Sequence, residues 1–161
     1  MMRRLQRILL LTILPVLSAC QGTVWQSSVP SYPVQLKIDT RLGQYVHFVP
    51  SNIYSYITVD KNGYHFGTHT MPRTPLDYYG YGGVVVFIDG NGLYSSFDLT
   101  CPHCLNPTQP LDINGIFAIC PICGEQYDLS FGYATPTQGI CREPLRKYTT
   151  IYSNDVITIR N

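Results

Sequence analysis

Two cysteine pairs constrain this chain more than any other feature of its 161 residues. Two residues separate Cys101 from Cys104, two separate Cys120 from Cys123, and fifteen residues lie between the pairs. Cysteines at this spacing are typical ligands of a tetrahedral zinc ion, because each short loop presents two sulfurs to the same ion. The sequence Asp-Ile-Asn-Gly at 112–115 predicts a hairpin that folds one pair back toward the other.

A second grouping of these residues indicates a different cofactor. His103 can take the place of Cys104, which gives Cys101-x-His103, a gap of sixteen residues, and Cys120-x-x-Cys123. This grouping resembles the Rieske ligand pattern, Cys-x-His followed by Cys-x-x-His. Cys123 then stands where the second histidine belongs.

The sequence after the second pair extends the resemblance. Rieske domains follow their second ligand loop with a glycine and then an aromatic-Asp pair, which are here Gly124 and Tyr127-Asp128. The segment 139–148 resembles their proline loop and the strand after it, so the similarity covers residues 84–161. A zinc site alone gives no reason for these residues.

The resemblance implies a [2Fe-2S] cluster with Cys101 and Cys120 on one iron and with His103 and Cys123 on the other. It also implies that the Tyr127 hydroxyl donates to a cluster-bound thiolate. A protein of this kind would be an electron carrier rather than an enzyme, with a redox partner protein that the sequence does not name.

The fold implied by the resemblance is all-β, with small antiparallel sheets in a β-sandwich and the ligand loops 101–104 and 120–124 at one tip. The residue pattern independently favours strands, because the apolar stretches are short and are separated by turn residues. We expect strands at 34–38 and 45–49 and a surface loop at 68–83. Four hairpins are expected, at 55–67, at 84–97, around 112–115 and around 153–155.

The first residues predict export from the cytoplasm. A basic start followed by an apolar run indicates a signal peptide at 1–19. The sequence Leu-Ser-Ala-Cys that ends at Cys20 resembles the lipobox of bacterial lipoproteins, which implies lipid attachment at Cys20 and a tether at 20–33. The β domain would then span 34–161 and be held to a membrane of the bacterial cell envelope by the lipid on Cys20. This combination is similar to Rieske-like lipoproteins of the Bacteroidetes type in which Cys replaces the second His.

Composition excludes some classes of function. The predicted signal peptide carries three of the 11 basic residues and none of the 10 acidic ones, so the mature chain has a net charge of 8 minus 10, or minus 2. A nucleic-acid partner is not expected, because binding to phosphates requires a basic surface. The sequence also has no nucleophile elbow, phosphate loop or recognisable acid-base pair, so we expect no catalytic site.

Three states of the cysteines remain open at this stage. The first is the [2Fe-2S] cluster, and the second is zinc bound by four thiolates with Cys104 as the alternative ligand to His103. The third has no metal and contains disulfides, which an oxidising compartment favours. With zinc or disulfides, the chain would be a non-redox binding or assembly module of the envelope.

Overall fold

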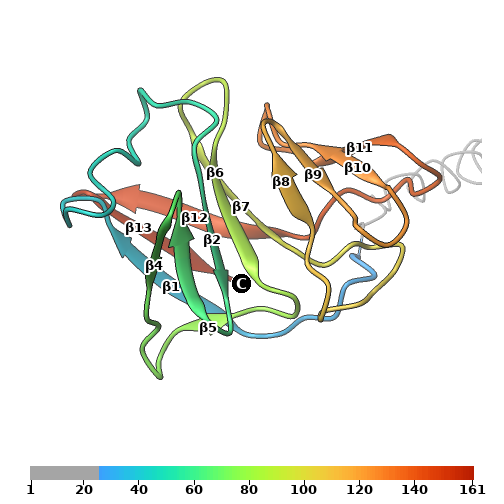
Figure 1. Ribbon diagram of the computed structural model, residues 1–161, viewed down its shortest axis with the longest axis horizontal. Helices are drawn as coiled ribbons and strands as arrows, with labels where there is room; N and C mark the ends of the chain where they lie inside the picture. The colour runs from blue at the N-terminus through green and yellow to red at the C-terminus, as the bar shows by residue number, and fades with distance from the viewer. Residues whose placement is uncertain (1–25) are drawn as a thin grey trace, which may run out of the picture.

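The computed structural model describes residues 26–161, and every helix-or-strand element in that range is a β-strand (Figure 1). The strands are β1 Val34–Asp39, β2 Tyr56–Asp60, β3 Gly63–Phe66, β4 His69–Met71, β5 Tyr78–Tyr79, β6 Val84–Ile88, β7 Tyr94–Asp98, β8 Asp112–Asn114, β9 Phe117–Ile119, β10 Gln126–Asp128, β11 Thr135–Gln138, β12 Lys147–Ser153 and β13 Val156–Arg160. All neighbouring strands are antiparallel. The predicted all-β architecture of antiparallel sheets is therefore confirmed.

The strands form two sheets of unequal size. The larger has the order β4-β3-β2-β6-β7-β12-β13-β1-β5 and the smaller has the order β11-β10-β9-β8. The smaller sheet, orange in Figure 1, lies to one side of the larger one, next to β6 and β7. The chain enters it from β7 and leaves it toward β12, so the two sheets belong to one continuous fold.

Strand β6 lies between two hydrophobic cores. Side chains alternate along a strand, so Val84, Val86 and Ile88 pack into the core of the larger sheet while Val85 and Phe87 face the opposite way. All five side chains are fully buried. Burial on both faces explains why the sequence of this strand is apolar without interruption.

The second core connects β6 to the smaller sheet and to the cysteine loops. Val85, Phe87 and Phe97 from the larger sheet pack there with Ala118 and Tyr127 from the smaller one. The first cysteine of each pair is also buried in this core. The position of the ligand loops therefore depends on the packing of this core.

The four predicted hairpins are confirmed. They are β2–β3, β6–β7, β8–β9 and β12–β13. Asn154 and Asp155 form the last turn with φ values of 51° and 61°. Short polar side chains tolerate this left-handed conformation. Turn residues and apolar alternation were thus sufficient to predict these local pairings.

Two other predictions from the sequence were wrong. Residues 45–49 form consecutive turns instead of a strand, with the Tyr45 N–H bonded to the Leu42 carbonyl and the Phe48 N–H bonded to the Tyr45 carbonyl. Tyr45 and Phe48 are buried in the core of the larger sheet. The buried residues are therefore three positions apart, as in a turn, and not two apart, as the predicted strand requires. The loop expected at 68–83 contains the short edge strands β4 and β5.

The described part of the predicted tether packs against the domain. Val29 is buried, and Ser27 and Ser28 both donate hydrogen bonds to the Glu143 carboxylate. The predicted signal peptide and the lipidation site Cys20 lie outside the described residues. Within residues 26–161, no helix has the length and hydropathy needed to cross a membrane.

A buried carboxylate fixes the segment that leads into the first ligand loop. Asp98 is fully buried and accepts hydrogen bonds from the Tyr148 hydroxyl at 2.6 Å and from the backbone N–H groups of Tyr81, Gly82 and Thr100 at 3.0, 3.3 and 2.7 Å. Several donors to one carboxylate compensate its loss of hydration. Thr100 directly precedes the first cysteine, so this network connects the larger sheet to the ligand loop.

Replacing Asp98 by Ala should lower the free energy of unfolding by about 3 kcal/mol, because four hydrogen-bond donors, three of them in buried hydrogen bonds, lose their acceptor. Urea denaturation followed by circular dichroism measures the change. Asp112→Ala is the matched control, since Asp112 is exposed on the edge strand β8. Its loss should change stability by at most about 0.5 kcal/mol, as is usual for surface substitutions. Equal stability of the two variants would contradict the assigned role of Asp98.

Candidate metal centre

Two loops of the same backbone shape carry the cysteine pairs. In the first loop the N–H of Leu105 donates to the carbonyl of Cys101, and in the second the N–H of Gly124 donates to the carbonyl of Cys120, both at 2.9 Å. Leu105 and Gly124 both have positive φ, 52° and 74°. A tight loop of this kind requires that left-handed conformation. Each loop therefore turns its two cysteines toward the same side.

The fold brings the two loops together. The first follows β7, the second joins β9 to β10, and the hairpin of β8 and β9 returns the chain from one to the other. The Cys120 N–H also donates to the Glu125 carbonyl, which closes the base of the second loop. The hairpin predicted between the cysteine pairs thus brings the two loops together, as the sequence indicated.

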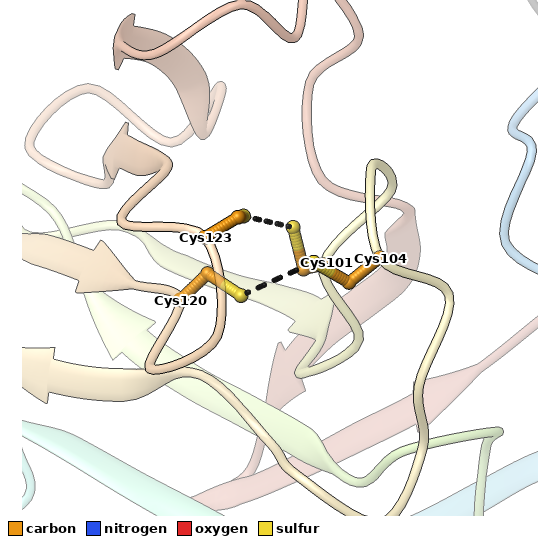
Figure 2. Close-up of side chains that lie close together, drawn as sticks. All are labelled: Cys101, Cys104, Cys120 and Cys123. Atoms are coloured by element: carbon orange, nitrogen blue, oxygen red, sulfur yellow. Dashed lines mark hydrogen bonds between the residues drawn. The ribbon is translucent and has the colours of Figure 1, made fainter.

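Four sulfur atoms converge between the loops. The Sγ atoms of Cys101, Cys104, Cys120 and Cys123 all lie within 4.8 Å of one another. Across the two loops, Cys101 lies 3.8 Å from Cys123 and Cys104 lies 3.8 Å from Cys120 (Figure 2). The group is graded in exposure, from the buried Cys101 and Cys120 to the exposed Cys123.

The two cross-loop distances of 3.8 Å match the dimensions of a site for one metal ion. A tetrahedron with metal–sulfur bonds of about 2.3 Å has edges of about 3.8 Å. A [2Fe-2S] cluster divides its four protein ligands between two irons joined by bridging sulfides, which places ligands of different irons farther apart. The donor set and its spacing therefore fit a single tetrahedral ion better than a two-iron cluster.

His103, which the Rieske pattern assigns to the outer iron, does not belong to this group of converging atoms. It is exposed, whereas its neighbour Cys104 points a sulfur into the group. The fourth sulfur of the group is therefore that of Cys104, the alternative ligand in the zinc grouping. Ligation by His103 stays a prediction.

The environment affects the four thiols unequally. Burial raises the pKa of Cys123 and of Cys104. Burial acts the same way on Cys120, but its pKa is lowered because the backbone N–H groups of Cys123 and Ile122 are directed at its sulfur. A metal ion at the centre of the group would keep all four sulfurs deprotonated.

Tyr127 lies against the group from inside the second core. Its hydroxyl is 3.5 Å from the Cys101 sulfur, and the side chain is fully buried. Burial raises the pKa of this phenol, and the nearby sulfurs of Cys101 and Cys141 add to the shift, so the hydroxyl keeps its proton and can donate to a thiolate. Donation by Tyr127 to a cluster-bound thiolate, which the resemblance implies, stays a prediction.

Sequence reasoning missed the role of Glu125. This buried side chain accepts hydrogen bonds from the backbone N–H groups of Ile140 and Cys141, at 2.6 and 3.0 Å, and so connects the second ligand loop to the segment 139–141. A Cβ on Gly139 would lie 2.2 Å from the carboxylate, and Gly139 has a φ of +108°. The only signal in the sequence is a charged residue between the second cysteine pair and strand β10.

Comparison with known proteins adds two solved structures of similar shape. One is a complex of reduced oxygenase and oxidized ferredoxin in carbazole 1,9a-dioxygenase, with a TM-score of 0.44, 15% identity, and coverage of 79% of this chain and 93% of that chain. The other is Sphingomonas yanoikuyae B1 ferredoxin, with a TM-score of 0.41, 16% identity, and coverage of 70% and 93%. No protein-family model and no curated protein matches the chain. At these levels of similarity, the assignment of ligands depends on the geometry of this chain itself.

The two short sulfur contacts predict which disulfides form in the metal-free chain. Chelation followed by mild oxidation with diamide should join Cys101 to Cys123 and Cys104 to Cys120, since each of these pairs is 3.8 Å apart across the loops. Each bond forms as two thiols lose two protons and two electrons to the oxidant. Peptide mapping by mass spectrometry distinguishes the pairings. Bonds within each pair, Cys101 to Cys104 and Cys120 to Cys123, would contradict this expectation.

Proposed function

We propose that this chain is a non-redox β module whose four cysteines bind one structural zinc ion. The observation that supports this function is the convergence of four sulfurs within 4.8 Å, with two contacts at the edge length of a zinc–thiolate tetrahedron. Four thiolates complete the coordination of zinc and leave no open position for water or substrate. The site therefore holds the two loops together and performs no catalysis.

The smaller sheet is the part of the fold that needs such a link. Its strands β8, β9 and β10 have three residues each and β11 has four. Strands this short form few backbone hydrogen bonds, and small sheets require packing or a cross-link to be stable. Zinc supplies the link by joining the loop after β7 to the loop between β9 and β10.

The second candidate function is electron transfer through a [2Fe-2S] cluster held by Cys101, His103, Cys120 and Cys123. The contact between the Tyr127 hydroxyl and the Cys101 sulfur favours it, because such a donor stabilises electron density on a ligand sulfur. An exposed His103 would offer a redox partner protein a route to the metal. This function requires the second loop to move away from Cys104, since a two-iron cluster is larger than the space between the four sulfurs.

Two variants separate the candidates. Cys104→Ser should lower zinc affinity at least about a hundredfold, because one of the four thiolates is lost. His103→Ala should leave zinc affinity unchanged, since the ring is not among the converging atoms. Inductively coupled plasma mass spectrometry gives the metal per chain, and competition with a chromophoric chelator gives the affinity.

The opposite result would support the electron carrier. It would consist of about two irons per chain, visible absorbance that depends on His103, and no effect of Cys104→Ser. The metal should be measured in protein purified from its native envelope, because expression in a foreign cytoplasm can load a different metal. Loss of secondary structure on chelation, with no redox signal, is expected for the zinc module.

The location in the bacterial cell envelope is part of the same proposal and depends on Cys20. Replacing Cys20 by Ser should move the protein from the membrane fraction to the soluble fraction, because the attachment site of the acyl chains is lost. Fractionation followed by immunoblotting measures the distribution. Cys141→Ser is a control that removes a cysteine outside the four-sulfur group. Retention of the Cys20→Ser variant in the membrane would contradict lipid anchoring.

A further inference from the structure

A groove on the side of the domain is lined by residues that the metal centre does not use. It has a volume of about 480 Å³ and lies between the β6–β7 turn and the loop after β10. Its main lining residues are Asp89, Leu93, Ser95, Phe131, Tyr133 and Lys147. We refer to it as the aromatic groove.

The rim of the aromatic groove is apolar and exposed. Phe131 and Tyr133 are 65% and 69% exposed, and Leu93 on the opposite side is 62% exposed. Scattered exposed apolar residues are ordinary, but these three line one concave surface. Aromatic rings in such a position offer flat faces for a ligand to stack on.

The floor of the groove is polar. Asp89 and Ser95 are 3% and 5% exposed. The Oδ1 atom of Asp89 accepts hydrogen bonds from the N–H groups of Asn91 and Leu93 in the β6–β7 turn. Among the described residues, neither Asp89 Oδ2 nor Ser95 Oγ has a hydrogen-bond partner, so both oxygens are available to a ligand in the groove.

A glycine lies next to these two oxygens. A Cβ on Gly132 would lie 2.6 Å from Ser95 Oγ and 3.1 Å from Asp89 Oδ2, so any side chain at residue 132 would collide with them. Gly132 has a φ of +71°, which also favours glycine. Both oxygens therefore lie beside Gly132, the residue between Phe131 and Tyr133 in the chain, and the side chains of these two residues line the groove.

Lys147 holds the rim in place. Its ammonium group donates to the Gly132 carbonyl at 2.7 Å and lies 5.7 Å from the centre of the Tyr133 ring. These contacts fix the loop that carries both aromatic residues before any ligand arrives. An ammonium group has three donors, so Lys147 can also bind a ligand oxygen.

We propose that the aromatic groove binds a sugar ring of a neutral oligosaccharide. A pyranose has an apolar face of C–H groups that stacks on aromatic rings, and hydroxyl groups at its edge that both donate and accept hydrogen bonds. The Asp89 carboxylate takes a donated hydrogen bond, the Lys147 ammonium group gives one, and the Ser95 hydroxyl does either.

Other ligand classes match the groove less well. The Asp89 carboxylate repels phosphates and carboxylates, and the Lys147 ammonium group repels cations. A wholly apolar ligand would cover Asp89 Oδ2 and Ser95 Oγ without giving them partners, which costs free energy. The mixture of exposed rings with one acidic, one basic and one hydroxyl group is matched by an uncharged ligand that is apolar on one face.

The test uses the whole purified chain with its metal bound. Cellohexaose, maltohexaose, laminarihexaose, mannohexaose and fully N-acetylated chitohexaose, all uncharged, serve as probes in saturation-transfer NMR and calorimetry. At least one of them should bind and give saturation transfer to its ring C–H protons. Phe131→Ala should weaken binding about tenfold by removing a stacking surface, and Ser95→Ala about fivefold by removing a hydrogen bond.

Tyr78→Ala is the matched control, because Tyr78 is an exposed aromatic residue on β5, outside the groove. It should bind the oligosaccharide as tightly as the unaltered chain. Urea midpoints show whether each variant is folded. Failure of all five oligosaccharides to bind would overturn the proposal, as would equal affinity of the Phe131→Ala variant and the unaltered chain. Neither result bears on the zinc centre, which is tested separately by metal analysis.

Discussion

Burial of strand β6 on both faces is the constraint on which the rest of the structure depends. Val84, Val86 and Ile88 close the core of the larger sheet, and Val85 and Phe87 form the base of the second core. The smaller sheet covers that second core, and the first cysteine of each pair is buried in it. The separation of the ligand loops is therefore set by apolar packing beneath them, before any metal contributes free energy.

Backbone geometry then determines what the loops can bind. The two loops share a hydrogen bond from the fifth residue to the carbonyl of the first, so each directs two sulfurs to the same side. Because the loops face each other, their sulfurs form a compact group of four. A site of this size would suit the single ion proposed above, and four charged thiolates in a partly buried space are stable only with a cation among them. Tyr127 contacts the sulfur of Cys101, and Glu125 bonds the second ligand loop to the segment 139–141.

The sequence predicted those features that depend on local chemistry. Turn residues such as Asn91-Gly92 specified hairpins, and the spacing of the cysteines specified that two pairs would meet. It did not predict the turns at Tyr45 and Phe48, where contacts with distant core residues outweigh local alternation. The Glu125 interaction was missed for a related reason: its partners lie 15 and 16 residues away, and no local pattern relates a carboxylate to those N–H groups. Whether His103 or Cys104 points inward is decided by the loop conformation, which spacing alone does not give.

The metal centre and the aromatic groove lie at opposite ends of the same short strand. Strand β10 begins after the second ligand loop and ends before the loop that carries Phe131 and Tyr133. It pairs with β9 and β11, which have three and four residues, so few backbone hydrogen bonds hold it beyond the packing of Tyr127 in the second core. A zinc ion bound as proposed would fix one end of β10 and restrict the other end, and Lys147 restrains the loop there from the larger sheet. A structural metal would in this way serve a binding surface that it does not touch, because a preorganised groove loses less entropy when a ligand binds.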